Sequence, residues 1–233
     1  MVAAESARRA ELVEAARALS ALGLVTAYGH VSVRVRGTVL ITPAADLATV
    51  TESSVVGLPL EPGTLPAGAP AETWAHLAVY RARPDATAIA RAQPPAAFAV
   101  AARVDALRPL YGQAAWLGEW VPVHDDARLL RSAELAESAA ASLPAGEALL
   151  LRGNGALTLG GTPGIAVARM WLLSAACEAH TGAGPSARPL STVEIESWRA
   201  VRDELLPRLW AHLRRRCAAP ASPAAPDLDG SLR

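Results

Sequence analysis

At 233 residues the chain is long enough for one sizeable core, and no stretch in its middle resembles a linker, so we predict a single domain. Its 22 basic and 22 acidic residues balance to zero, which excludes a broad electrostatic footprint for nucleic acid or an anionic membrane. A small-molecule ligand or self-association is favoured instead. Every basic residue is Arg, and without a single Lys the chain excludes any mechanism that needs a lysine Schiff base.

The cysteine pattern and the N-terminus indicate where the protein resides. Cys177 and Cys217 are too few and too far apart for a disulfide framework, which fits a reducing compartment. The first ten residues are charged and carry no apolar signal-peptide core, and the longest apolar stretch, 165–177, is too short for a bilayer and is interrupted by Arg169. We therefore expect a cytoplasmic protein.

The first third of the chain predicts helices around a hairpin. Apolar residues at helical spacing predict a helix over 4–22, which Gly23 ends. Residues 31–36 alternate strictly, turn at Gly37-Thr38 and return through 39–42, which predicts a hairpin with one face in water. A short strand over 55–60, a Pro- and Gly-rich loop over 61–70 and a helix over 71–83 follow.

The remainder alternates strands with helices. The sequence predicts a strand that contains Ile89 and ends at Gln93, followed by a helix from Pro94-Pro95 to 101. A strand over 120–123 and a helix over 133–142 come next. Strands over 148–152 and 156–159 then flank the turn Gly153-Asn154-Gly155, and a buried helix runs from Thr162-Pro163 to 181–182. A capping box, Ser191 with Glu194, begins a last helix running to Arg216. The predicted domain therefore covers residues 1–216, and the Ala- and Pro-rich tail 217–233 is too poor in apolar residues to order itself. Strand pairs interleaved with helices predict a mostly antiparallel sheet covered by helices.

The strand that ends at Gln93 carries the most informative pair of residues. Alternation sends Arg91 and Gln93 to one side of this strand, at a spacing that suits two metal ligands. Neither residue is a good ligand for a divalent ion.

Four stretches, taken together, resemble the class II aldolase/adducin family over roughly residues 8–215. They are Gly29-His30-Val31-Ser32-Val33-Arg34 with Leu40-Ile41-Thr42-Pro43; Pro70-Ala71-Glu72 with His76 and residues 80–85; the strand to Gln93-Pro94; and residues 150–155 with Gly160. The resemblance implies a three-layer α/β/α sandwich and a homotetramer with active sites between subunits. It also implies carbon–carbon bond cleavage, epimerisation or decarboxylation, assisted by a divalent ion on a His-x-His pair and a third His before a Gly.

This chain departs from the family pattern at every metal-ligand position. Arg91 and Gln93 stand where the His-x-His pair would be, and Asn154 stands where the third His would be. A guanidinium repels a divalent ion and amides replace imidazole poorly, so we predict no metal at that site and no cofactor. The alternative is that the strand register is misassigned and that ligands lie elsewhere, although no other histidines pair at ligand spacing.

A second departure concerns phosphate. His30 after Gly29, Ala44-Ala45 after Pro43 and Ala71 before Glu72 replace the phosphate pocket of the family's sugar-phosphate aldolases. The Gly-His-Val-Ser form looks more like the branch of aromatic-acid decarboxylases and their relatives in specialised metabolism. A non-phosphorylated small molecule is therefore the expected substrate.

The resemblance and the residue chemistry together assign candidate roles. Glu72 matches the acid/base carboxylate, with a pKa raised if the pocket is dry, but its position would also suit an ordinary first-turn Glu. Arg91 would replace the charge of the ion and hold a carboxylate or enolate, or it would only pair with Glu72 in an abandoned site. Gln93 and Asn154 would donate to the same oxyanion, or serve as filler and turn residues.

Three further residues complete the candidate set. His30 would contact substrate or transfer a proton, with a structural hydrogen bond as the alternative. His76, one turn after Glu72, would bind substrate or only orient the carboxylate, and Tyr28 would act near the pocket mouth.

Three hypotheses follow for the whole protein. The first is a metal-independent lyase-like enzyme that acts on a small carboxylate or carbonyl compound by decarboxylation, elimination, cyclisation or aldol-type chemistry. The second is a non-catalytic assembly module, for which adducin is the precedent. The third is a metalloenzyme that recruits Glu72 with His30 or His76.

Overall fold

The computed structural model describes residues 2–184 and 186–218. Its helices are α1 Val2–Ala21, α2 Thr73–Ala82, α3 Pro95–Ala101, α4 Ala133–Ala141, α5 Pro163–Ala183, α6 Thr192–Ala200 and α7 Arg202–Ala218, with 3₁₀ turns η1 Glu52–Ser54 and η2 Gly112–Leu117. Its strands are β1 His30–Val35, β2 Thr38–Ile41, β3 Val56–Pro59, β4 Ala88–Ala92, β5 Ala106–Leu107, β6 Val121–His124, β7 Ala148–Leu151 and β8 Gly155–Gly160. None of the described helices combines the length and apolar character needed to cross a bilayer.

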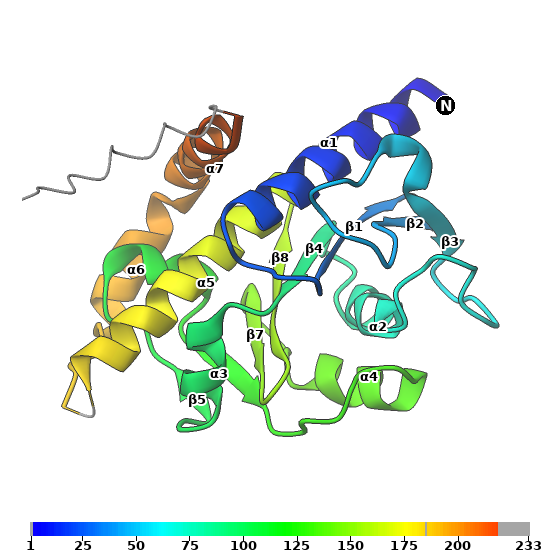
Figure 1. The fold of residues 1–233 in the computed structure, drawn as a ribbon. Coiled ribbons are helices and arrows are strands. Elements are labelled where there is room, and N and C mark those ends of the chain that lie inside the picture. Colours follow the sequence, from blue (N-terminus) through cyan, green and yellow to red (C-terminus); the bar gives the residue numbers. More distant parts are fainter. Residues whose placement is uncertain (1, 185, 219–233) are drawn as a thin grey trace, which may run out of the picture.

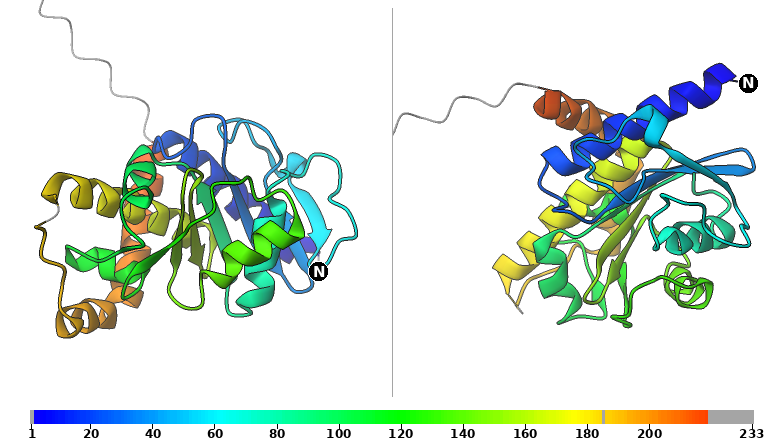
Figure 2. Two further views of the ribbon diagram at one scale, coloured as in Figure 1. Left: turned by 90° about the horizontal axis from the view of Figure 1, so that it is seen from below. Right: turned by 45° about the vertical axis from the view of Figure 1, so that its right-hand side comes forward.

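The strands form one eight-stranded sheet between two layers of helices (Figures 1 and 2). The strand order is β3-β2-β1-β4-β8-β7-β6-β5, and every pairing is antiparallel except that of β6 with β7. One hydrophobic core lies between the sheet and α1, α3 and α5, and a second lies under α2 and α4. The predicted α/β/α sandwich with a mostly antiparallel sheet is confirmed.

Strand β4 lies at the centre of the sheet and shows how the sequence separates these two cores. Ala88, Ala90 and Ala92 face α5, whereas Ile89 belongs to the core under α2 and α4. Because side chains alternate along a strand, Arg91 shares the face of Ile89 and therefore points towards α2. The alternation thus places one charged residue at the end of a fully buried strand.

The first hairpin differs from its prediction in two ways. Its turn is Arg36-Gly37, one residue earlier than expected, with Arg36 at a φ of 58° and Val35 paired with Thr38. The prediction that one face lies in water is wrong over most of β1, because α2 covers that face: Ser32 is fully buried and Arg34 is half-buried, and only Arg36 at the turn is exposed. Polar residues on this face are therefore buried and need hydrogen-bond partners.

The single last helix that the sequence predicts is in fact two helices. The chain breaks at Val201, between α6 and α7. The indole Nε1 of Trp116 donates to the carbonyl oxygen of Trp198 at 2.9 Å, which is the oxygen that Arg202 N–H would use if the helix continued. Helix α7 then runs to Ala218, and the rest of the predicted tail, 219–233, lies outside the described residues.

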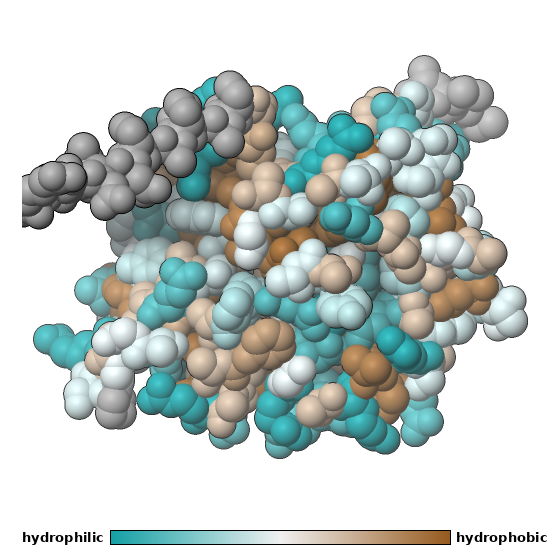
Figure 3. Space-filling model, viewed as in Figure 1, coloured by the Kyte–Doolittle hydropathy of each residue, from teal (hydrophilic) through white to brown (hydrophobic). Residues whose placement is uncertain are grey.

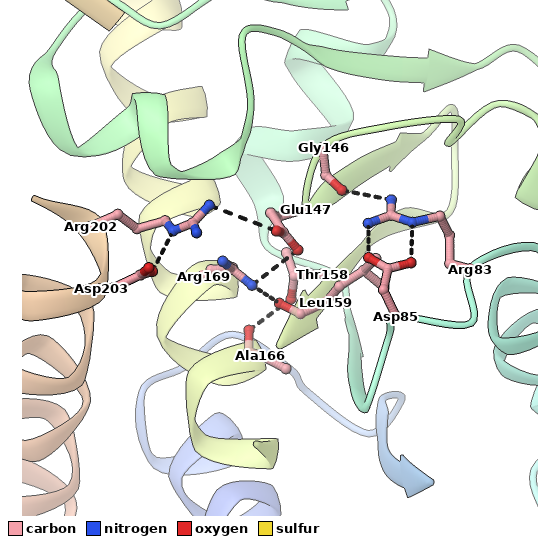
Figure 4. A network of polar contacts seen from close by, with 10 residues as sticks. All are labelled: Arg83, Asp85, Gly146, Glu147, Thr158, Leu159, Ala166, Arg169, Arg202 and Asp203. Atoms are coloured by element: carbon pink, nitrogen blue, oxygen red, sulfur yellow. Dashed lines mark hydrogen bonds and ion pairs between the residues drawn. The ribbon is translucent and has the colours of Figure 1, made fainter. Parts of the chain in front are cut away.

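A network of ion pairs ties α5 and α7 to the sheet at the end of β8 remote from Asn154 (Figure 4). Nη1 of the buried Arg169 lies 3.1 Å from Oε2 of Glu147 and donates to the carbonyl of Leu159 at 2.8 Å. Arg202 approaches the other oxygen of Glu147 at 4.0 Å. Arg202 also pairs with Asp203 at 2.9 Å, and Arg83 pairs with Asp85 at 2.7 Å, so three arginines face three carboxylates in Figure 4. We therefore interpret the network as structural.

The face of the molecule drawn in Figure 3, which has the same viewpoint as Figure 1, is mixed in character. In the space-filling view, hydrophobic residues lie in several separate groups among hydrophilic ones (Figure 3).

Candidate functional site

A cavity of about 790 Å³ opens where β1 and β4 meet the start of α2. Its lining contains Tyr28, His30, Glu72, Arg91, Gln93 and Asn154, which are all of the candidate residues from the sequence except His76. Its lining also contains residues that the sequence reasoning did not single out, namely Thr26, Ala27, Asp46, Leu129 and Arg131. The strands thus bring together side chains that are up to 126 positions apart, from Tyr28 to Asn154.

The register of the sheet places His30 and Arg91 side by side. They are paired residues on the neighbouring strands β1 and β4, so both side chains emerge on the α2 face. Asn154 reaches the same point from the turn between β7 and β8, in which Gly155 has a φ of 83°. A Cβ on Gly155 would lie 2.2 Å from the carbonyl oxygen of Ala92, so only glycine lets this turn pack on the end of β4.

Arg91, Glu72 and Asn154 form a closed polar triangle at the base of the cavity. Arg91 is 3% exposed, and its Nη2 lies 2.9 Å from Oε2 of Glu72. The same nitrogen donates to Oδ1 of Asn154, whose Nδ2 donates to Oε1 of Glu72 at 2.8 Å. Gln93 Nε2 donates more weakly to Oδ1 of Asn154, at 3.4 Å. All three sides of the triangle are therefore polar contacts, and Arg91 takes part in them through Nη2 alone.

Glu72 occupies the N-cap position of α2, but its side chain caps no helical amide. It points instead to Arg91, to Asn154 and to the backbone N–H of Leu130 at 3.4 Å. Burial alone would raise the pKa of Glu72, but His30, the Arg91 guanidinium and the Asn154 amide together lower it to about 2. A raised pKa was expected only for a dry pocket, and in the free protein these neighbours outweigh desolvation, so that the pKa is lowered instead.

Behind the cavity wall a run of buried polar side chains begins at His30. Its Nε2 lies 3.7 Å from Oε2 of Glu72, and its Nδ1 lies 2.7 Å from Nε2 of His76. Nδ1 of His76 lies 2.6 Å from Oγ of Ser32, which in turn lies 2.8 Å from the hydroxyl of Tyr80. Desolvation by burial lowers the pKa of both histidines. His76 is fully buried outside the cavity lining, and its direct partners are His30 and Ser32 rather than Glu72.

Sequence reasoning missed Ser32 and Tyr80, although a pattern pointed to them. Glu72, His76 and Tyr80 recur every four residues along α2, and His30 and Ser32 recur every two along β1. Both periods place the side chains of an element on one face. Polar residues at every second position of a strand and at every fourth position of a helix have nearly the same spacing in space. This match could have suggested that the two faces meet.

The donor set at the base of the cavity does not fit a divalent ion. Nη2 of Arg91 already contacts Oε2 of Glu72 and Oδ1 of Asn154, which are the oxygens that an ion would need there. Both ring nitrogens of His76 are taken by His30 and Ser32. Across residues 2–184 and 186–218, no three His, Cys, Asp or Glu side chains are grouped closely enough to hold a metal. The cation that the geometry provides at this point is the guanidinium.

Comparisons with known proteins agree with the fold. The family described as "Class II Aldolase and Adducin N-terminal domain" matches residues 10–181. A 3,4-dihydroxyphthalate decarboxylase from Terrabacter sp. (strain DBF63) is 30% identical over 184 residues, covering 70% of this chain and 76% of that protein.

Solved structures extend the likeness to three dimensions. The L-fuculose-1-phosphate aldolase of Thermus thermophilus is 33% identical, with a TM-score of 0.68, covering 77% of this chain and 99% of its own. An aldolase II superfamily protein from Pseudomonas syringae, 23% identical, has a TM-score of 0.77 and covers 91% of this chain and 92% of its own, which shows a shared fold. The family match spans most of the chain and its relatives are aligned over most of their length. The chain belongs to the class II aldolase and adducin family.

Proposed function

We propose that this protein is a metal-independent lyase that acts on a small, non-phosphorylated carboxylate or carbonyl compound through an enolate-like anion. The observation that carries the proposal is the guanidinium of Arg91, held at the base of an open cavity next to a carboxylate and two amides. A fixed cation with hydrogen-bond donors beside it stabilises an oxyanion as it develops. That is the electrostatic task that a divalent ion performs in the chemistry implied by the family.

Arg91 has donors to offer a ligand. Its side-chain hydrogen bond to Asn154 and its ion pair with Glu72, which are its polar side-chain contacts with described residues, both use Nη2. Nε and Nη1 therefore provide donors for a substrate carboxylate or carbonyl oxygen in the cavity. A second anion at Arg91 would also weaken its attraction to Glu72.

This competition gives Glu72 a role in moving a proton. Desolvation by burial is the largest influence on its pKa and acts upwards, against the contribution of Arg91. When a substrate anion takes part of the charge of Arg91, the pKa of Glu72 rises towards the range in which a carboxyl group holds and delivers a proton. In a decarboxylation Glu72, its pKa raised by the bound anion, first takes a proton from solvent. The bond between the carboxylate carbon and its neighbour then breaks, carbon dioxide leaves, the electron pair remains as an enolate facing Arg91, and Glu72 delivers its proton to that carbon.

The lining of the cavity favours a substrate without phosphate. Ala44, Ala45 and Ala71 belong to this lining, and their methyl groups offer no side-chain donor to a phosphate. Leu129 and Tyr28 add apolar surface at the rim, and Arg131 adds an exposed cation. The relative named for 3,4-dihydroxyphthalate, an aromatic carboxylate without phosphate, supports this class and favours decarboxylation.

We also propose a homotetramer in which a neighbouring subunit completes the cavity. Tyr28 is 70% exposed and Leu129 is 48% exposed in the single chain, both at the rim. Exposed apolar side chains beside a functional cavity are typical of an interaction surface. Light scattering on the purified protein measures the assembly, and a Tyr28→Glu/Leu129→Glu variant that stayed tetrameric would show that the interface lies elsewhere.

A second candidate function is a non-catalytic assembly module. The observation in its favour is that the charge of Arg91 is balanced by Glu72, and that Asn154 bonds to both side chains, without any ligand. In a module this triangle would be a structural replacement for the metal.

One experiment separates these functions. The full chain, treated with a chelator, is incubated with aromatic and aliphatic carboxylates and with sugar phosphates, and carbon dioxide and carbonyl products are measured. We expect turnover of a carboxylate in the presence of chelator, reduced roughly 10²- to 10⁴-fold by Glu72→Gln. Turnover only of sugar phosphates and only with added metal would contradict the proposal, and stable folding without turnover or ligand binding across the panel would favour the module.

A further inference from the structure

We propose that Tyr80, Ser32 and His76 form a one-directional hydrogen-bond chain that holds His30 as a neutral imidazole with its Nε2–H directed at Glu72 and the cavity. His30 would then donate a hydrogen bond to a substrate anion and would not act as a base. The inference deepens the proposed function by assigning the protonation state of a residue in the same site. Ser32, His76 and Tyr80 are positioning residues in this arrangement, since they act through His30.

The chain arises from a match between two repeats. Alternate residues of a strand are separated by roughly 6.6 Å, and residues four apart on a helix rise by about 6 Å. His30 and Ser32 on β1 therefore meet His76 and Tyr80 on α2 in step, with nitrogen and oxygen atoms 2.6–2.8 Å apart at all three junctions. The two elements present complementary polar stripes.

Burial makes the chain obligatory. His30 is 5% exposed, whereas Ser32, His76 and Tyr80 are fully buried. A buried polar group without a partner costs about 1–3 kcal/mol, so each of these groups depends on the next. A break at one junction would leave partners unsatisfied on both sides of it.

The carboxylate at the end of the chain decides its direction. Glu72 is ionised, and its Oε2 lies 3.7 Å from Nε2 of His30. A lone pair on Nε2 would face this negative charge, whereas an N–H is attracted to it. The proton of neutral His30 therefore belongs on Nε2, and Nδ1 is an acceptor.

The remaining proton positions follow from this one. If Nδ1 of His30 accepts, Nε2 of His76 must donate, and Nδ1 of His76 must accept from the hydroxyl of Ser32. Ser32 then accepts from Tyr80, whose hydroxyl lies 2.8 Å from Ser32 but 3.4 Å from the carbonyl of Thr87. The shorter contact is the one with Ser32. It agrees with a Tyr80 hydroxyl that donates to Ser32, in the same direction along the chain, towards Glu72, as the other donors.

The same chain resists protonation of His30. An imidazolium carries N–H on both nitrogens, so its Nδ1–H would oppose the N–H of His76 unless the whole chain reversed. The charged and titratable groups that face His30 are Glu72, Arg91 and His76, and burial with Arg91 lowers the pKa of His30 against the opposing effect of Glu72. Arg34, on β1, lies over the ring of Tyr80 at 5.4 Å and provides a cation at the far end.

Nitrogen NMR of histidine-labelled full chain, without any substrate, tests the inference. His30→Gln and His76→Gln variants assign the signals. We expect both rings to be neutral Nε2–H tautomers at pH 7 and to remain so at pH 5.5. An Nδ1–H tautomer of either ring, or an imidazolium at pH 7, would overturn the inference.

Two substitutions test the chain itself. Ser32→Ala removes the donor to His76 Nδ1, and Tyr80→Phe removes the donor to Ser32, so we expect mixed tautomers or new titration of His30 in either variant. Thr158→Val is the matched control, because it removes another buried hydroxyl, bonded to the carbonyl of Ala166 at 2.8 Å, and should leave the histidine signals unchanged. Histidine signals that do not respond to Tyr80→Phe, the milder of the two changes, would contradict the chain.

The result is independent of turnover. A correct tautomer pattern in a protein that turns over no carboxylate would support the chain and contradict the proposed function. Turnover of a carboxylate by a protein with Nδ1–H histidines would support the proposed function and contradict the chain.

Discussion

Nη2 of Arg91 lies 2.9 Å from Oε2 of Glu72, and the two side chains are 3% and 12% exposed. This is the ion pair that the sequence suggested as the alternative to a substrate-binding arginine. The structure shows the pair in the wall of an open cavity, so pairing in the free protein and substrate binding are compatible.

Removal of one partner should cost more than removal of both. Arg91→Met leaves the Glu72 carboxylate buried without its counter-charge, and we expect a loss of about 3 kcal/mol in the free energy of unfolding. Arg91→Met/Glu72→Gln should recover part of that loss, because no unpaired charge remains. Urea unfolding of the single and double variants measures the coupling, and strictly additive losses would contradict a direct pair.

The pKa of Glu72 should respond to Arg91 in a defined direction. The carboxyl has a pKa of about 2 because its neighbours outweigh the effect of burial. In Arg91→Met we expect this pKa to rise, because the upward effect of burial is then opposed only by His30 and Asn154. Carbon NMR titration of the side-chain carboxyl measures it, with Arg131→Met on the rim as a control that should shift it much less. A pKa that stays near 2 in Arg91→Met would show that Arg91 is not the partner.

Acidification should destabilise the protein through its two buried histidines. Burial holds the pKa of His30 and His76 below the ordinary value of 6.5. The unfolded chain therefore binds protons that the folded chain does not, and the contribution to stability is present above pH 6.5 and is lost as the pH falls below it.

His76→Gln should flatten this dependence. Each histidine contributes a slope of up to about 1.4 kcal/mol per pH unit below pH 6.5, and the variant removes one of them. Unfolding free energies between pH 5 and 7 provide the measurement, with the exposed His212→Gln as control. An unchanged slope in His76→Gln would mean that His76 is protonated in the folded state.

The ion network at the far end of β8 should support α5. Glu147→Gln removes the carboxylate from the buried Arg169, and we expect a loss of about 3 kcal/mol in the free energy of unfolding. Asp203→Asn, at an exposed pair with Arg202, should change it by less than about 1 kcal/mol. Equal losses in the two variants would contradict the structural role of Glu147.

The parts of the site that the sequence predicted depend on local rules. Strand alternation placed Arg91 and Gln93 on one face, and the Asn-Gly turn placed Asn154 between β7 and β8, and the structure has both. These outcomes follow from periods and turn chemistry that operate within a few residues.

The parts that the sequence missed depend on contacts between distant segments. The polar face of β1 was assigned to water because the sequence of β1 does not show that α2 covers it. The break at Val201 depends on the indole of Trp116, 82 residues from the carbonyl it occupies. The effect of burial on the pKa of Glu72 was foreseen, and so was its possible pairing with Arg91, but the contacts of Glu72 with His30 and Asn154, which also lower this pKa, were not.

Metal content tests the central claim most directly. Full-length protein purified without chelator is compared by elemental analysis with Arg91→His/Gln93→His/Asn154→His, which places imidazoles on the side chains that now converge beside Glu72. If the guanidinium has taken the place of the ion, the unmodified chain contains far less than one zinc, iron or manganese per subunit, and the triple variant contains about one. One ion per subunit in the unmodified protein would contradict the account.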